Sequence, residues 1–260
     1  MHMPHASAVC VCLDGGMHAE LSLSFIVSPF LQATCSILAE TRPGGAALII
    51  DPGFGVHEQV ESTLKTLNAS PAAIALTHGH LDHVADAHRV ASAWDLPVLI
   101  GTGDAYRLEQ PIDQLPEAFT TQLRPAWEQH GWKRPEKTRE LNATDSLALG
   151  EKQLRTLTLP GHTEGSTMVV IDAPVQVNPA PGVMAGAALA ERGVAFTGDV
   201  LFRGSIGRTD LPGGDPDQMR TSLEQLLAFA QEHPDMLVVP GHGPVSDFRR
   251  ELTENRFLNL

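Results

Sequence analysis

The feature that most constrains this chain is a set of His and Asp residues placed where short apolar runs end. The densest part is the run THGHLDH at residues 77–83, which directly follows the apolar run 72–76. Residues i and i+2 of an extended segment point the same way, so His78 and His80 can hold one ion together. Asp82 and His83 lie where the strand is expected to become a helix, and they can turn toward a second ion. Imidazole and carboxylate ligands suit zinc, iron, manganese or cobalt.

Three further strand ends carry a candidate ligand of the same kind. His162 lies in PGHT at residues 160–163, Asp199 follows the apolar run 194–197, and His242 lies in a second Pro-Gly-His. Taken singly, a pair of His is usually a surface cluster that binds nothing. A His in a turn is more often solvated, and a helix cap or turn explains Asp199 equally well. Because rigid scaffolds present functional groups on loops at strand ends, the four coincidences together predict one metal site.

These motifs resemble the metallo-β-lactamase superfamily, and the match extends from about Asp51 to the C-terminus. Within that superfamily the chain most resembles the glyoxalase II-like (hydroxyacylglutathione hydrolase-like) hydrolases. The runs that carry the narrower match are GDVLF at 198–202, GRTDL at 207–211 and GHGP at 241–244. The resemblance implies an α+β fold, a four-layer αββα sandwich with a dinuclear metal site at one edge of the two sheets.

The resemblance also implies a role for each candidate residue. The assigned metal ligands are His78, His80 and His162 for the first ion, Asp82, His83 and His242 for the second, and Asp199 as the bridge between them. Asp82 and Asp199 are thereby the expected catalytic residues. Asp51 matches an acidic residue that orients a ligating imidazole through its free N–H. The implied cofactors are two divalent metal ions, with zinc preferred and iron or manganese as alternatives.

Two such ions hold a bridging hydroxide at neutral pH, because each lowers the pKa of bound water, and they stabilise the oxyanion that forms. A thioester suits this chemistry, since a thiolate with a conjugate-acid pKa of about 8–9 leaves with little general-acid help. We therefore expect a thioesterase that cleaves an S-2-hydroxyacylglutathione-like substrate. The alternatives are a persulfide dioxygenase with a single iron, and a lactonase or β-lactamase. The GHGP ending favours the dinuclear hydrolase, and no Cys stands at a ligand position as in many zinc β-lactamases.

Substrate contacts are less constrained by the sequence. Arg208 is the candidate for holding a substrate carboxylate, because a planar guanidinium suits bidentate contact. A surface ion pair with Asp210 or Asp215 explains Arg208 equally well. The pattern departs from glyoxalase II at Glu164, where many relatives have Pro, and in the eighteen residues after His242, where a glutathione-contacting helical extension is expected. Glutathione and other thiol carriers therefore both remain open.

Composition narrows the class of partner. The chain has 18 Lys and Arg against 31 Asp and Glu, a net charge of −13, and nucleic acids and anionic membranes both require clustered positive charge. No apolar run approaches the roughly twenty residues that span a bilayer, and three Cys do not suggest a disulfide framework. We expect a cytoplasmic enzyme with a small anionic thioester substrate and no nucleic-acid or membrane partner.

Apolar periodicity gives a coarse map of the chain. Strands are expected at 21–27, 46–50, 72–76, 97–100, 153–159, 167–171, 194–197 and 236–239, and helices at 55–68, 84–94 and 216–231. Residues 104–140 are expected to form short helices and loops, and 173–192 an inserted surface loop. Residues 1–20 are expected to be an N-terminal tail, and 21–260 a single metallo-hydrolase domain.

Overall fold

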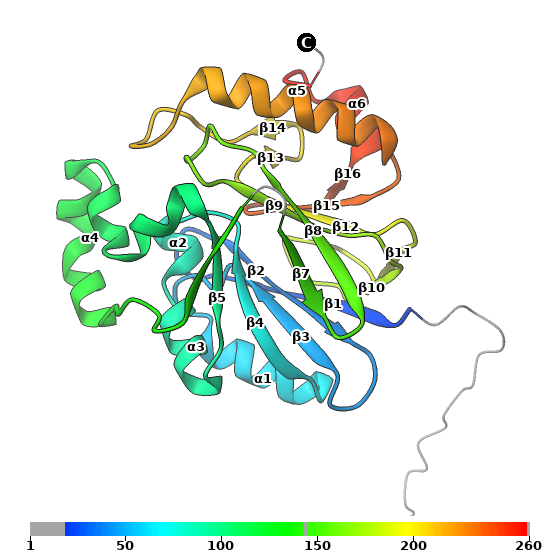
Figure 1. Ribbon diagram of the computed structural model, residues 1–260, viewed down its shortest axis with the longest axis horizontal. Helices are drawn as coiled ribbons and strands as arrows, with labels where there is room; N and C mark the ends of the chain where they lie inside the picture. Colours follow the sequence, from blue (N-terminus) through cyan, green and yellow to red (C-terminus); the bar gives the residue numbers. More distant parts are fainter. Residues whose placement is uncertain (1–18, 143–144, 259–260) are drawn as a thin grey trace, which may run out of the picture.

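The computed structural model describes residues 19–142 and 145–258. Two β-sheets lie face to face, and helices cover the outer face of each sheet, so the elements form four layers in the order α, β, β, α (Figure 1). This is the α+β sandwich that the sequence predicted. The expected N-terminal tail lies outside the described residues except for Ala19 and Glu20.

The first sheet has eight strands in the order β11-β10-β1-β2-β3-β4-β5-β6. β3, β4, β5 and β6 are parallel neighbours, so their carboxyl ends meet at one edge of the sheet. The strands are β1 (Leu21–Val27), β2 (Thr34–Glu40), β3 (Ala46–Ile50), β4 (Ser70–Leu76), β5 (Val98–Gly101), β6 (Thr138–Leu141), β10 (Val175–Val177) and β11 (Ala188–Ala190).

The second sheet has six strands in the order β16-β15-β12-β9-β8-β7. β12 and β15 are parallel neighbours, so these two strands also end at the same edge. The strands are β7 (Ser146–Leu149), β8 (Lys152–Thr158), β9 (Thr167–Ile171), β12 (Val194–Gly198), β15 (Leu237–Pro240) and β16 (Ser246–Asp247), and the hairpin β13 (Leu201–Phe202) and β14 (Ser205–Ile206) stands beside them.

The helices divide between the two outer layers. α1 and α3 lie on the first sheet, α5 and α6 lie on the second, and α4 stands out at one side of the sandwich (Figure 1). The helices are α1 (His57–Leu67), α2 (Leu81–Val84), α3 (Ala87–Trp94), α4 (Glu117–His130), α5 (Pro216–Glu232) and α6 (Phe248–Glu254), with short 3-10 helices η1 (Thr102–Leu108) and η2 (Pro111–Gln114). None of the helices within the described ranges is long and apolar enough to cross a membrane.

Side-chain alternation along the strands builds the core. In β1, Leu21 and Leu23 point into the space between the sheets, where they join Phe196 and Val169 of the second sheet. Because successive strand residues face opposite sides, the same strands also present side chains to the helices outside. Val60 of α1 packs on the outer face of the first sheet, and Met219, Leu223 and Leu226 of α5 pack on the outer face of the second. The two sheets are thereby buried on both faces, which fixes the strand ends that carry the site.

Two sequence expectations are wrong in part. The segment 173–192 is not only a loop, since β10 and β11 within it add two strands to the edge of the first sheet. The segment 104–140 contains the fourteen-residue helix α4 and the start of β6 in addition to short helices. Val175 and Val177 are fully buried, which explains why so Pro- and Gly-rich a segment still forms a strand. Strands β2, β6, β7 and β16 were not expected from the periodicity.

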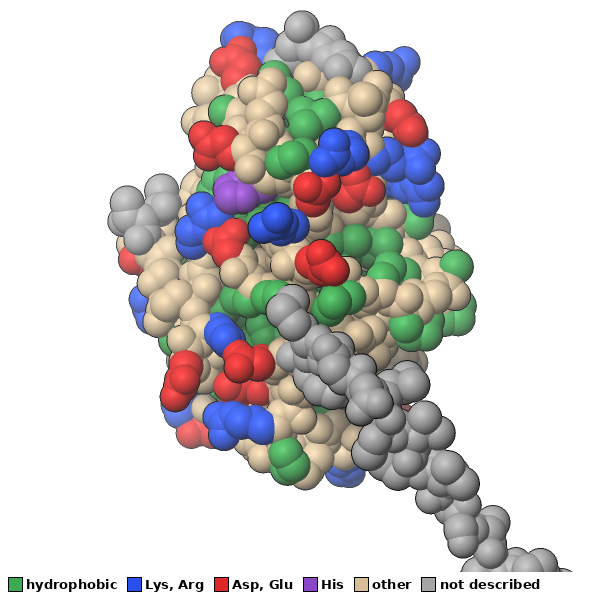
Figure 2. Space-filling view, turned by 90° about the vertical axis from the view of Figure 1, so that its right-hand side faces the viewer, with side chains coloured by type: hydrophobic (Ala, Val, Ile, Leu, Met, Phe, Trp, Pro, Cys, Tyr) green, Lys and Arg blue, Asp and Glu red, His purple; other side chains and the backbone are tan. Residues whose placement is uncertain are grey.

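Charged side chains of both signs are interspersed on the outer surface. Figure 2 shows this on the face beside β10 and β11, where Lys and Arg side chains alternate with Asp and Glu. Arg155 pairs with Asp172, and Arg249 pairs with Asp235. Exposed pairs of this kind contribute about 0–1 kcal/mol each, so they neither hold the fold together nor mark a site.

Candidate metal centre

The candidate ligands come from loops that follow four different strands. His78, His80, Asp82 and His83 follow β4 of the first sheet, and His162 lies between β8 and β9 of the second. Asp199 directly follows β12, and His242 follows β15. Backbone hydrogen bonds tie these loops across the two sheets, from Thr167 N to Thr77 O (2.7 Å) and from Thr34 N to Gly241 O (2.7 Å). The structure therefore brings all seven predicted ligands to one edge of the sandwich.

Three imidazoles converge in the first group. His80 Nδ1 lies 3.1 Å from His78 Nε2 and 2.9 Å from His162 Nε2. One nitrogen this close to two others matches a common cation better than a chain of hydrogen bonds, because a single ring N–H can serve only one of them. His78 and His80 project the same way from the extended segment, as the i, i+2 spacing predicted.

The second group contains two imidazoles and a carboxylate. His242 Nε2 lies 3.2 Å from His83 Nε2 and 3.3 Å from Asp82 Oδ2. Asp82 and His83 occupy the first turn of α2, where the extended segment becomes helical. The turn after His80 directs Asp82 and His83 toward His242, while the His83 ring also lies against His78 of the first group, with ring centroids 4.2 Å apart.

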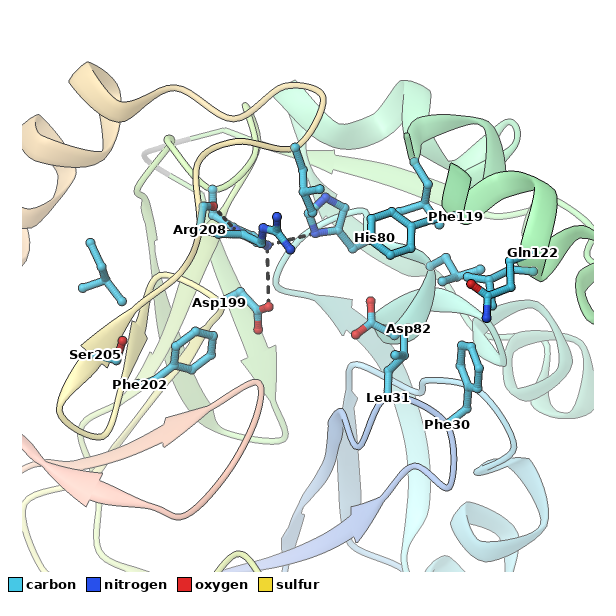
Figure 3. A pocket seen from close by; sticks show the side chains of 16 residues that line it. Phe30, Leu31, His80, Asp82, Phe119, Gln122, Asp199, Phe202, Ser205 and Arg208 are labelled. Atoms are coloured by element: carbon cyan, nitrogen blue, oxygen red, sulfur yellow. Dashed lines mark hydrogen bonds and ion pairs between the residues drawn. The ribbon is translucent and has the colours of Figure 1, made fainter. Parts of the chain in front are cut away.

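Asp199 lies between the two groups. Its Oδ1 is 3.4 Å from His83 Nε2, and its Oδ2 is 3.6 Å from His162 Nε2 and 3.5 Å from His242 Nε2. Asp199 Oδ1 is buried and has no hydrogen-bond partner among the described residues. A buried carboxylate oxygen without a partner is costly, and a cation shared by both groups would relieve that cost. Figure 3 shows the carboxylates of Asp82 and Asp199 facing the same space.

The outer ring nitrogens of His83 and His162 are held by protein groups, which leaves the inner nitrogens of these two rings free to ligate, whereas His80 Nε2 is buried without a hydrogen-bond partner among the described residues. His83 Nδ1 lies 2.9 Å from Asp51 Oδ2, and His162 Nδ1 donates to Arg208 O at 2.8 Å. Asp51 also accepts from the Thr77 N–H (2.7 Å) and hydroxyl (2.6 Å), so its two oxygens are occupied by these partners. Asp51 thus contacts both His83 and the start of the ligand loop, a position that suits the imidazole-orienting role that the resemblance implies.

Electrostatics differ between the two groups. Burial, and then the neighbouring imidazoles, lower the pKa of His78 and His80 well below the ordinary value, so both rings are neutral and able to ligate. For His83 burial also opposes the charged form, but Asp199, Asp82 and Asp51 outweigh it and raise its pKa to about 10. The carboxylates around the second group therefore favour a positive charge at this position, which a bound divalent cation would supply.

Two glycines make room for the ligands. A Cβ on Gly241 would lie 2.1 Å from Asp199 Oδ1 and 2.7 Å from His83 Cε1. Gly161 has φ +135°, and a Cβ there would lie 2.4 Å from Met219 Cα. Neither position admits a side chain without displacing a ligand or helix α5. This accounts for the Gly-His pair that recurs in the sequence.

A carboxylate that sequence reasoning missed ties two of the ligand loops together. Asp104 is fully buried, and its Oδ2 accepts from the Gly79 N–H (2.6 Å) and the Thr163 hydroxyl (2.7 Å). Its Oδ1 accepts from the Gly165 N–H at 2.7 Å. Asp104 thereby fixes the backbone beside His78, His80 and His162 without touching them. The signal was present in the sequence, because Asp104 follows a strand and a glycine as Asp199 does.

Glu164 has a structural partner. Arg107 is fully buried, and its Nη2 donates to Glu164 Oε2 at 2.5 Å and to Pro212 O at 2.9 Å. Tyr106 donates its hydroxyl to Glu164 Oε1 at 3.1 Å. Burial opposes the charged form of Glu164, but the hydrogen bond from Arg107 and the other contacts outweigh burial and lower the pKa of Glu164. The carboxylate therefore stays charged beside the buried guanidinium. Glu164 therefore neutralises Arg107 next to the His162 loop.

A cavity of about 680 Å³ opens onto the ligand set. His80, Asp82, His162 and Asp199 line it at one end. Arg208 also lines it, and its Nε and Nη2 donate to Asp210 at 2.6 and 2.7 Å, the ion pair that the sequence offered as an alternative reading. Both side chains of that pair are more than half exposed. The ligand set is thus accessible to a small molecule.

Comparison with known proteins identifies the family. A model described as the metallo-beta-lactamase superfamily matches residues 29–175 and 178–242. The chain belongs to the metallo-β-lactamase superfamily. This superfamily binds divalent metals and consists mostly of hydrolases, which agrees with the convergent ligands described above. The superfamily that the sequence motifs indicated is therefore confirmed.

Three relatives within the superfamily bear on function. The chain is 28% identical to hydroxyacylglutathione hydrolase GloC of Haemophilus influenzae over 92% of its length and 99% of the relative. Two solved structures superpose with TM-scores of 0.68. One is the B3 metallo-beta-lactamase BLEG-1, 29% identical and covering 92% of this chain and all of that one. The other is TTHA1623 in a di-iron-bound form, 31% identical and covering 90% of this chain and all of that one.

Proposed function

We propose that the protein is a metal-dependent thioesterase of the glyoxalase II type. It would hydrolyse an acyl-thiol, so that one water and one thioester give a carboxylic acid and a free thiol. The observation that supports this most is the pair of three-residue ligand groups that share Asp199. When bound, two divalent ions supply a water that is activated at neutral pH and a positive charge that stabilises the oxyanion. We propose zinc for both positions, as the resemblance implies, with iron or manganese as the alternatives that imidazole and carboxylate donors also suit.

The chain's own residues position the reactants. Asp82 contacts His242 and His83 through Oδ2, which leaves Oδ1 to orient the attacking water by accepting a hydrogen bond from it. Asp199 holds the two ligand groups at a fixed separation.

The groups that line the cavity favour a thioester over an amide. Each His and Asp among the described lining residues belongs to the candidate ligand set, namely His80, Asp82, His162 and Asp199. None of these is free to protonate a leaving amine. A thiolate leaves without such help because its conjugate acid has a pKa of about 8–9. The similarity to GloC, whose name states hydroxyacylglutathione hydrolase, supports the same reaction class.

A substrate panel tests the proposal. Metal-loaded protein would be given S-lactoyl and S-acetyl thioesters, a persulfide with oxygen, a lactone and a β-lactam, with metal content measured on each preparation. We expect thioesters to be the preferred class. Faster oxygen consumption with the persulfide would favour the iron-dependent dioxygenase, and faster ring opening would favour the lactonase or β-lactamase.

Arg208 is the proposed contact for an anionic group on the substrate. Its present partner Asp210 is exposed, and exposed ion pairs are weak, so a substrate carboxylate can replace it at small cost. We expect Arg208→Ala to raise KM by about three- to tenfold for an anionic thioester with little change in kcat. Arg203→Ala is the matched control, because Arg203 is exposed nearby but does not line the cavity. An unchanged KM in Arg208→Ala would leave Arg208 as a surface ion pair only.

A further inference from the structure

The cavity has one wall that is almost entirely apolar. Phe119 and Leu123 of α4 form it together with Leu115 and with Phe30 and Leu31 of the turn between β1 and β2. Phe119 and Leu123 are four residues apart and therefore lie on the same face of the helix. In Figure 3, Phe30 and Phe119 stand on the side of Asp82, across the cavity from Phe202 and Ser205.

Other side chains pack behind this wall and hold its residues in place. Phe30 packs on Phe54 with ring centroids 5.4 Å apart, and Phe54 packs on His130 at 4.4 Å. Leu123 and Leu115 pack on the buried cluster that includes Trp127. The apolar groups that face the cavity are thus backed by a second layer of aromatic side chains, which keeps the wall in place when the cavity is filled with water.

Two of the most exposed large hydrophobic side chains lie on this wall. Leu31 is 53% exposed and Phe119 is 47% exposed, and the described residues contain only two other large hydrophobics of this kind, Tyr106 and Leu189. Leu31 also has φ +55°, a conformation that is unfavourable for leucine. An apolar ligand that covers these two side chains removes their apolar surface from water, which favours binding.

The wall offers little to a polar ligand. Gln122 is its one polar side chain among the described lining residues, while Ser205 and Arg208 lie on the opposite wall. A peptide thiol such as glutathione carries several amide and charged groups, and each needs a partner when it leaves water. Against this wall most of the amide and charged groups of glutathione would have no hydrogen-bond partner.

We propose, resting on the thioesterase function above, that the substrate carries an apolar substituent of about six carbons or an aromatic ring, which lies against the α4 wall. The ligand set holds the scissile carbonyl at one end of the cavity, and the substituent extends from it over Leu31 and Phe119. The substituent belongs either to the acyl group or to the leaving thiol, and both present the same apolar surface.

The experiment measures thiol release from two thioester series. The first varies the acyl group on N-acetylcysteamine from acetyl to hexanoyl and phenylacetyl. The second keeps the acetyl group and varies the thiol from mercaptoethanol to hexanethiol. A buried methylene is worth a factor of about four, so we expect kcat/KM to rise by at least about tenfold from the small to the apolar member of one series. The series in which the rise occurs assigns the substituent to the acyl or to the thiol side.

Variants link the preference to the wall. In Phe119→Ala and Leu31→Ala we expect the ratio of kcat/KM for the apolar member to kcat/KM for the small member to fall by about tenfold. Leu189→Ala, which removes an exposed leucine from β11 away from the cavity, should leave both values unchanged.

A binding measurement separates this inference from the proposed function. Calorimetric titration of the metal-loaded protein with hexanoate and acetate should give at least about tenfold tighter binding of hexanoate, and Phe119→Ala should abolish the difference. Flat kinetic series together with equal binding would overturn the inference while thioester hydrolysis stands. Tighter hexanoate binding without hydrolysis of any thioester would overturn the proposed reaction and keep the apolar site.

Discussion

Two buried groups of His and Asp side chains stand out among the residues that the structure describes, and one of the two has the form of a metal centre. The first is the ligand set at the strand ends. The second lies beside α3 and α4 and consists of His88, His130 and Asp86, enclosed by Trp127 and Trp132. The two groups differ in access: the His242 side chain of the ligand set is 29% exposed at the cavity, whereas the His130 and Asp86 side chains of the second group are 3% and 0% exposed.

The direction of the ring nitrogens distinguishes the two groups. His130 Nε2 and His88 Nδ1 both donate to the carbonyl of Ala85, at 2.9 and 3.1 Å. Asp86 Oδ2 accepts from the backbone N–H groups of Val56 and His57. In the ligand set the nitrogens instead face one another around a common point. In the second cluster the two donating ring nitrogens are satisfied by the backbone, and Asp86 Oδ1, which has no hydrogen-bond partner among the described residues, lies 3.3 Å from His130 Nε2. In the ligand set the lone pairs of several imidazoles converge instead, and that arrangement suits a cation.

The largest expected effect is the loss of the shared carboxylate. Asp199→Ala removes the oxygens that lie between the two ligand groups, so we expect kcat for the thioester to fall by about a hundredfold or more. Steady-state kinetics and metal analysis of the same sample would check this. Near-normal turnover would contradict the bridging position of Asp199.

A smaller effect is expected from the residue that orients His83. Asp51→Asn replaces a carboxylate that accepts from His83 and Thr77, and changes of this kind weaken metal affinity by about ten- to a hundredfold. Competition with a chelating dye measures the affinity directly. An unchanged affinity would mean that the ring of His83 is held by other contacts.

A substitution in the second cluster should change the stability of the fold and leave metal binding unchanged. In His130→Leu the carbonyl of Ala85 loses one of its two donors, and we expect the free energy of unfolding to fall by about 1–2 kcal/mol. The number of metal ions per chain should stay the same. Urea denaturation and metal analysis together test this, and a lost metal ion in His130→Leu would erase the distinction between the clusters.

A further effect is a pH dependence of stability. Burial, partly offset by the hydrogen bond to Ala85, lowers the pKa of His88 to about 4, below its ordinary value near 6.5. The unfolded chain therefore binds a proton between these values that the folded protein does not, so the stability present above pH 6.5 is lost as the pH falls toward 4. The difference in unfolding free energy between the wild type and His88→Gln should change between pH 7 and pH 5. A constant difference would mean that His88 titrates normally.

The sequence predicted the metal centre better than its surroundings. His78, His162, Asp199 and His242 stand at strand ends, and strand ends can be located from apolar periodicity alone. Asp104 carries the same signal but was overlooked, because nothing local shows that its carboxylate reaches the backbone of two other loops.

The fold and the cavity also depend on contacts between distant segments, which a local reading of the sequence does not show. The four layers followed from the resemblance, whereas periodicity gave only the approximate positions of individual strands and helices. β10 and β11 lie in a segment whose composition suggested a loop, and they are strands because β10 pairs with β1 and β11 pairs with β10. The apolar wall joins Leu31 to Phe119, which are far apart in the chain and both look like ordinary surface residues in sequence. Such a surface exists only after α4 packs beside the β1–β2 turn, so tertiary structure is needed to find it.

The most direct test of the account is the number of metal ions bound by the wild-type chain. Protein purified without chelator would be analysed by elemental mass spectrometry alongside His130→Leu and Asp199→Ala. The convergence of seven donors in two groups predicts two transition-metal ions per chain in the wild type and in His130→Leu, and fewer in Asp199→Ala. Well under one ion per wild-type chain would contradict the metal centre and the thioesterase proposal together.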